Sequence, residues 1–200
     1  MKFTKILVVV AVAALALMAF ANSASATTLA TKGVPENASV TIEATLAPGA
    51  SALLTDTSVL YLNTCTTSTV KGNTVSPFTV ADPGTIGGPV TTLSWSNCTE
   101  GNPVVEEKEG KKLNGTLSVQ HIAGTTNGTV RSSGAAVNVP TPVGLITCST
   151  NNTDMGTLNG KKEGHATFTI NAVLSCTVVG TAVWSGTYTI TSPTNLSVEA

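Results

Sequence analysis

The residues best suited to chemistry in this 200-residue chain are four cysteines, Cys65, Cys98, Cys148 and Cys176. In an exported chain an even number of cysteines is typical of disulfides, and four cysteines allow three pairings. We favour Cys65–Cys98 with Cys148–Cys176, because each pair closes the shorter loop within its own half of the chain. No Cys-x-x-Cys pair occurs, and the two histidines, His121 and His165, stand alone in the sequence. We therefore expect no metal ion and no other cofactor.

The histidines and acids form no catalytic pattern. His121 ends a strand pattern on its apolar face, and His165 precedes another strand beside a charged turn. The chain has no Gly-x-Ser-x-Gly elbow, and the acids of 106–109 are neighbours in one run rather than two separated carboxylates. We therefore expect no catalytic residues and a protein that is not an enzyme; a secreted hydrolase is one alternative.

The aromatic residues permit two interpretations. Trp95, Trp184, Tyr61 and Tyr188 could form a platform on which a ligand such as a carbohydrate stacks, and Trp184 and Tyr188 fall on the same face of one predicted strand. A β domain with so few aromatic residues also needs them to fill its core. We favour the core interpretation and keep the ligand platform as the alternative.

The elements that would position these residues are strands. Apolar and polar residues alternate with a period of two in several stretches: 40–46, 113–119, 167–176 and 184–190. Thr and Val, which are abundant, suit pleated surfaces because their branched Cβ is tolerated there. Turn signals such as Asp82-Pro83-Gly84 separate the stretches. The pattern predicts an all-β fold, an antiparallel two-sheet β-sandwich of Ig-like or jelly-roll-like type, after a helical signal peptide.

The N-terminus is typical of a secretory signal peptide. Lys2 and Lys5 precede an apolar run over 6–20, and Ala24-Ser25-Ala26 is a small-x-small cleavage site with Thr27 next. The run is short for a span of about 20 residues, so cleavage is favoured over a retained anchor. We expect a cleaved signal peptide over 1–26 and a single domain over 27–200.

The net charge of the chain limits the kinds of partner that we expect it to bind. Cleavage would remove two lysines and no acid, which moves the formal net charge from −1 to −3. Nucleic-acid binding would need a basic excess, so we expect no nucleic-acid partner. We expect a secreted or cell-surface protein with no membrane contact after cleavage; its partner is unknown, with a cell-surface glycan or protein as candidates.

The two halves of the chain echo each other. Leu62-Asn63-Thr64-Cys65 resembles Ile146-Thr147-Cys148, and in each half an aromatic strand and a second cysteine follow. The echo fits a two-fold β repeat over about 40–100 and 113–200. It fits equally well the abundance of threonine.

The C-terminal region carries a likeness to a known group. Cys176 is followed by Trp184-Ser185-Gly186-Thr187-Tyr188, and this pattern resembles uncharacterised secreted, Thr-rich β proteins of actinobacterial type. The likeness is best over the last 55 residues and implies export but no activity. The sequence therefore favours an exported, non-catalytic structural or interaction protein, with a secreted carbohydrate- or ligand-binding module as the main alternative.

Overall fold

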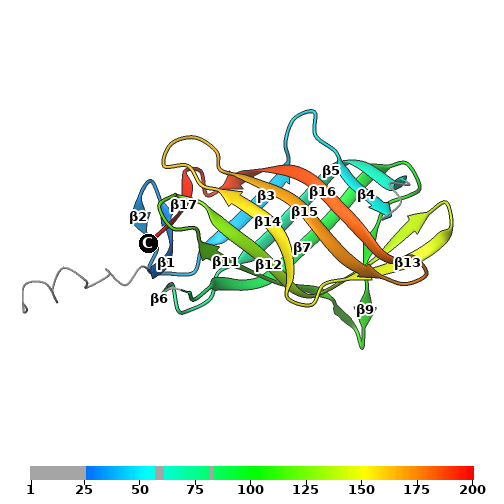
Figure 1. The fold of residues 1–200 in the computed structure, drawn as a ribbon, viewed down its shortest axis with the longest axis horizontal. Coiled ribbons are helices and arrows are strands. Elements are labelled where there is room, and N and C mark those ends of the chain that lie inside the picture. The colour runs from blue at the N-terminus through cyan, green and yellow to red at the C-terminus, as the bar shows by residue number, and fades with distance from the viewer. Residues whose placement is uncertain (1–25, 57–60, 82) are drawn as a thin grey trace, which may run out of the picture.

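The computed structural model describes residues 26–56, 61–81 and 83–200, and these residues form β-strands joined by turns (Figure 1). The predicted signal peptide lies outside the described residues except for Ala26, which opens the first strand. Across the described ranges, no helix is long and apolar enough to cross a membrane. The all-β, antiparallel class predicted from the sequence is confirmed.

The strands of the described residues follow in chain order: β1 (Ala26–Thr31), β2 (Val34–Pro35), β3 (Thr41–Leu46), β4 (Ala52–Asp56), β5 (Tyr61–Asn73), β6 (Thr79–Ala81), β7 (Ile86–Cys98), β8 (Val104–Val105), β9 (Glu107–Lys108), β10 (Lys111–Lys112), β11 (Asn114–His121), β12 (Gly128–Thr141), β13 (Gly144–Ser149), β14 (Thr153–Asn159), β15 (Thr167–Cys176), β16 (Gly180–Ser192) and β17 (Leu196–Glu199).

The main sheet closes on itself. Its antiparallel pairs run β3–β5, β5–β7, β7–β11, β11–β12, β12–β14, β14–β15, β15–β16 and finally β16–β3. The two layers expected of a sandwich are therefore joined along both edges. Apart from β3/β4 and β13/β14, which do not pair with each other, the strands around this closed sheet follow the order of the chain.

At each of two positions around the closed sheet, two short strands lie end to end. β3 and β4 both pair with β5 on one side and β16 on the other, at successive places along them. β13 and β14 share β12 and β15 in the same way. Counting each of these as one, eight antiparallel positions surround the interior. Closed sheets of this size have an interior that side chains fill or that holds one small ligand.

Alternation along each strand separates the interior from the outer surface. In β15 every second residue is buried, from Phe168 to Cys176, and the residues between them are exposed or half-buried. Thr167 and Thr169 face outward opposite Thr189 and Thr187 of β16. Such cross-strand Thr pairs stabilise a sheet modestly.

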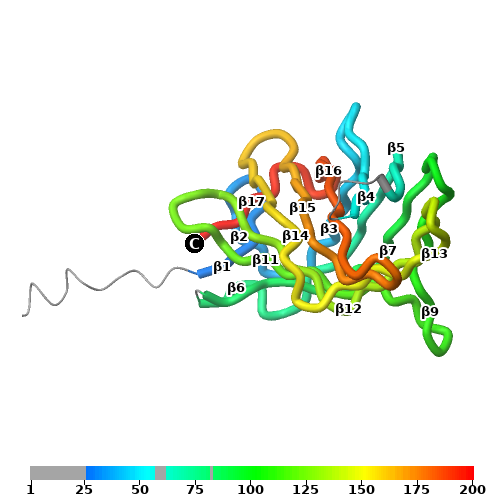
Figure 2. Tube along the Cα trace, turned by 45° about the vertical axis from the view of Figure 1, so that its right-hand side comes forward, coloured from blue at the N-terminus to red at the C-terminus, as the bar shows by residue number. Residues whose placement is uncertain are grey.

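A small second sheet covers one end of the closed sheet. β1 pairs with β17, β2 and β6, and Figures 1 and 2 show β1 and β17 side by side at that end. Leu196 and Val198 of β17 are fully buried. Thr27, the first residue after the predicted cleavage site, is also fully buried and donates to the carbonyl of Gly84 at 2.9 Å.

Both predicted disulfides are present. Cys65–Cys98 joins β5 to β7, and Cys148–Cys176 joins β13 to β15; each pair consists of register partners on adjacent strands. The two bridges lie four positions apart around the closed sheet, at the end opposite β1. This placement fits a two-fold repeat, which stays a prediction. Two intramolecular disulfides are typical of extracellular proteins.

Candidate functional site

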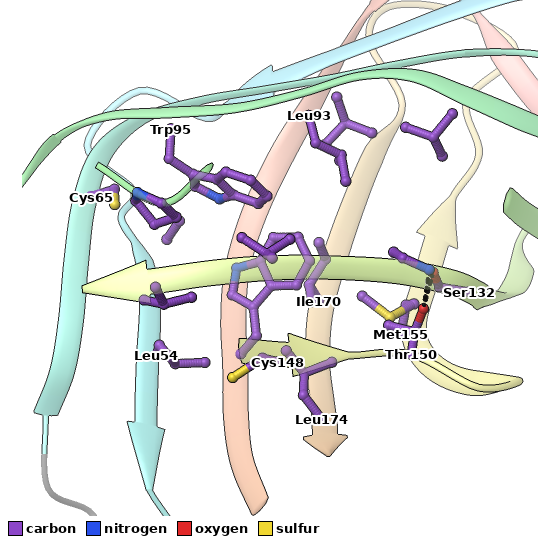
Figure 3. Close-up of a pocket in the computed structure, with 18 of the residues that line it drawn as sticks. Leu54, Cys65, Leu93, Trp95, Ser132, Cys148, Thr150, Met155, Ile170 and Leu174 are labelled. Carbon is purple, nitrogen blue, oxygen red and sulfur yellow. Dashed lines mark hydrogen bonds between the residues drawn. The ribbon is translucent and has the colours of Figure 1, made fainter. Parts of the chain in front are cut away.

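The interior holds a cavity of about 80 Å³ at the disulfide end (Figure 3). Its wall is mainly aliphatic and sulfur-containing, with Leu54, Leu93, Ile170, Leu174 and Met155 turned toward the same space in Figure 3. An apolar space with a small number of polar groups on its wall is the usual form of a small-molecule site. This cavity is therefore the candidate site.

Three aromatic rings from two strands that do not pair form a cluster, and two of them line the cavity. Trp95 of β7 and Trp184 of β16 approach edge to face across the interior, with ring centroids 5.8 Å apart. Tyr188 of β16 lies against Trp184 at 6.4 Å, with the rings perpendicular. Edge-to-face pairs of this kind add stability beyond their buried area. Both tryptophans line the cavity, so a molecule inside would touch their rings.

The sequence paired Trp184 with Tyr188, and the structure brings them together on the interior face. Tyr188 is fully buried and Trp184 is half-buried. A ligand that touches Trp184 from the interior would lie inside the closed sheet, whereas a sugar stacked on the outer surface would not reach Tyr188. Trp95, another of the aromatic candidates, completes the cluster, but its contact with Trp184 depends on closure of the sheet and has no local signal in the sequence.

Tyr188 is anchored by its hydroxyl, which donates to Ser68 Oγ on β5 at 3.0 Å. Burial raises the pKa of Tyr188 from 10.0 to about 12, while hydrogen bonding with Ser68 and Trp95 acts in the opposite direction. The buried phenol therefore stays protonated in the folded protein at pH values where an unfolded tyrosine ionises.

This pKa predicts alkaline sensitivity. Because the folded pKa lies above the unfolded value, the contribution of Tyr188 to stability is complete below pH 10 and is lost as the pH rises toward 12, by about 2–3 kcal/mol. Urea unfolding of the wild type and Tyr188→Phe across this range measures it. The variant should lose about 1 kcal/mol at pH 7, from the missing hydrogen bond, and show a shallower decline above pH 10. Parallel pH profiles would contradict the assignment.

A buried side-chain amide joins three segments at the disulfide end through hydrogen bonds. Asn63 of β5 is 3% exposed; its Nδ2 donates to the carbonyls of Gly101 at 2.9 Å and Pro140 at 3.0 Å. Its Oδ1 accepts from the Thr99 hydroxyl at 3.3 Å and from the Glu100 amide at 3.4 Å. All the hydrogen-bonding capacity of the side chain is thus used on the segment after β7 and the end of β12.

A second cavity of about 100 Å³ lies toward the opposite end, beneath β1 and β17. Leu29 and Leu196 of the small sheet line it. The two cavities share several wall residues, including Val70, Leu117 and Phe168. These side chains separate one cavity from the other.

The histidines lie away from both cavities. The His121 ring bonds the carbonyl of Thr125 at 2.8 Å, and the His165 ring bonds the carbonyl of Ile190 at 2.9 Å. Neither residue lines either cavity. Within the described part of the chain, no group of three or more His, Cys, Asp or Glu side chains is arranged to hold a metal ion.

No protein-family model, no curated protein and no solved structure matches this chain.

Proposed function

We propose that this protein is an exported, non-catalytic binding protein that takes up a small, uncharged, mostly apolar molecule in the interior of its closed sheet. The observation that carries the proposal is the apolar cavity at the disulfide end, with Trp95 and Trp184 in its wall. Burying an apolar molecule against such a wall is favourable because it removes apolar surface from water. The signal-type N-terminus and the two disulfides support export.

The size of the space limits the ligand. An apolar cavity of about 150 Å³ binds benzene, and one water needs about 10–15 Å³. A cavity of about 80 Å³ suits a few heavy atoms, and small movements of flexible wall residues such as Met155 would admit a five- or six-membered ring. The ligand is therefore a small ring compound or a short chain rather than a long lipid.

Tryptophan fluorescence tests the proposal directly. The chain has two tryptophans and both line this cavity, so their emission reports on it. Benzene and cyclopentanone should each give a saturable change, with a dissociation constant on the order of 1 mM or tighter, and should raise the melting temperature. Ala52→Val adds two carbons to the cavity wall and should weaken both ligands. Linear, non-saturating responses that are identical in Ala52→Val would overturn the proposal.

A second candidate is contact with a cell-surface partner through the same end of the molecule. Val143, Leu145 and Val178 at the turns there are 55%, 66% and 80% exposed. Exposed aliphatic residues gathered at one end favour contact with another surface. Loss of binding to isolated cell envelopes in a Leu145→Ser/Val178→Ser variant, with cavity binding retained, would support this candidate.

A further inference from the structure

The wall of the disulfide-end cavity is mostly apolar and contains one hydrogen-bonded pair of hydroxyls. Asn63 and Asn114 also line it, and their side-chain amides donate to backbone carbonyls. Ser132 of β12 and Thr150, which follows β13, share a hydrogen bond of 3.0 Å between their hydroxyl oxygens. Both residues line the cavity, and Ser132 is 4% exposed. Figure 3 shows the pair beside Met155, with the bond drawn between them.

A count of hydrogens leaves this pair with one unused donor. The two hydroxyls carry two hydrogens, and one of them lies in the Ser132–Thr150 bond. Thr150 Oγ1 also accepts a hydrogen bond from the Ala135 amide at 3.1 Å, so that contact uses an acceptor and not a hydrogen. Among the hydrogen bonds of the described residues, the second hydroxyl hydrogen has no acceptor. When Thr150 donates to Ser132, the unused hydrogen belongs to Ser132, which is buried, whereas Thr150 is half-buried. A buried donor without an acceptor costs free energy, so an acceptor inside the cavity would be favoured there.

A backbone irregularity lies beside this pair. Three neighbouring segments each contain a residue with a positive φ on one line across the sheet: Gly115 at 73°, Gly134 at 72° and Asn152 at 51°. A Cβ on Gly115 would lie 2.5 Å from the Ala135 amide nitrogen, so a larger residue does not fit there. Positive φ is tolerated by glycine and, less readily, by asparagine.

The irregular backbone along this line changes which residues of β12 face the interior. Val130 and Ser132 are buried before it, and Val137 and Val139 line the cavity after it. Because side chains alternate with a period of two, a regular strand that turns Ser132 inward would turn Val137 outward. The irregularity therefore places a hydroxyl in the wall without giving up the apolar residues beyond it. Local strand irregularities commonly re-aim side chains at functional sites.

We propose that the Ser132–Thr150 pair is the polar anchor of the cavity, and that its ligand is an uncharged molecule with one hydrogen-bond acceptor, such as a ketone, aldehyde or ether, on an apolar body. This inference rests on the proposed function and sharpens it. The acceptor takes the free hydroxyl hydrogen, and the apolar body lies against Met155, Ile170 and the tryptophan rings. A charged ligand is disfavoured because no opposite charge lines the cavity.

Two ligands of nearly the same shape test the anchor. Cyclopentanone carries a carbonyl oxygen where methylenecyclopentane carries a CH₂ group. Ser132→Ala/Thr150→Val removes both hydroxyls; it should weaken cyclopentanone about threefold to tenfold and change methylenecyclopentane less than twofold. Thr147→Val removes a hydroxyl from the outer face of β13 and should change neither ligand. Both affinities are measured by tryptophan fluorescence and checked by calorimetry.

A measurement on the wild-type protein covers the case in which the double variant does not fold. The carbonyl stretch of bound cyclopentanone should lie at lower frequency than in cyclohexane, because the hydroxyl donates to it. An unshifted stretch, or equal losses for the two ligands in the double variant, would overturn the anchor while leaving cavity binding intact. Failure of both ligands to bind the wild type would instead overturn the proposed function.

Discussion

Replacing all four cysteines with alanine should lower the free energy of unfolding by about 7 kcal/mol. Each bridge closes a loop, with sequence separations of 33 and 28 residues, and the chain-entropy model assigns about 3.6 kcal/mol to each loop of this length. A domain of this size has about 5–15 kcal/mol of stability in total. The variant without all four cysteines should therefore be largely unfolded at 37 °C. Each variant that lacks one bridge should fold but should be less stable than the wild type.

Urea unfolding followed by tryptophan fluorescence measures these losses. Cys65→Ala/Cys98→Ala and Cys148→Ala/Cys176→Ala serve as each other's matched controls, because their loops are of similar length and lie in opposite halves of the chain. The two losses should be similar and should add, since the bridges share no strand. A loss below about 1 kcal/mol for either pair would contradict the loop-closure argument.

Phe168→Ala should cost about 3–5 kcal/mol and at the same time improve the binding of aromatic ligands. Phe168 is 6% exposed and lies in the wall of both cavities. Its removal costs the transfer free energy of a buried ring plus the cost of the space it leaves. That space joins cavities of about 80 and 100 Å³, and the combined volume exceeds the roughly 150 Å³ that holds benzene.

The two effects are measured together by thermal unfolding with and without benzene. Saturating benzene should raise the melting temperature of Phe168→Ala more than that of the wild type, because the ligand stabilises the folded state in proportion to its affinity. Val173→Ala, on the outer face of the same strand and 58% exposed at the wild-type valine, should change stability by less than about 0.5 kcal/mol and leave benzene binding unchanged. A variant that loses stability but gains no benzene response would show that the wall collapses into the space.

Several features could be read from the sequence because they depend on local pattern. The alternation over 167–176 appears in β15 with the expected face buried. The disulfide pairing could be chosen from loop length, and the two cysteines of each chosen pair lie opposite each other on adjacent strands of the sheet. The two-layer expectation was incomplete, because alternation reports which face of a strand is buried and says nothing about which strands meet at the edges.

The sequence alone could group only part of the candidate site. Trp184 and Tyr188 could be paired because both lie on one strand. Trp95 reaches them from the far side of the closed sheet, and Ser132 meets Thr150 beside Gly134, whose amide donates to the Thr150 carbonyl at 3.0 Å. Serine and threonine are so abundant in this chain that no pattern distinguishes these two from the rest.

By itself, the sequence determined the strand character, the disulfide framework and the export-type N-terminus, because each of these follows from residues near one another in the chain. Only the tertiary structure decided that the sheet closes and that the closed space contains a cavity. Closure requires β3 to pair with β16, so that Thr45 lies opposite Thr189. Pairing over such a separation is set by the accumulated twist and register of every strand between them, for which no single segment carries a signal.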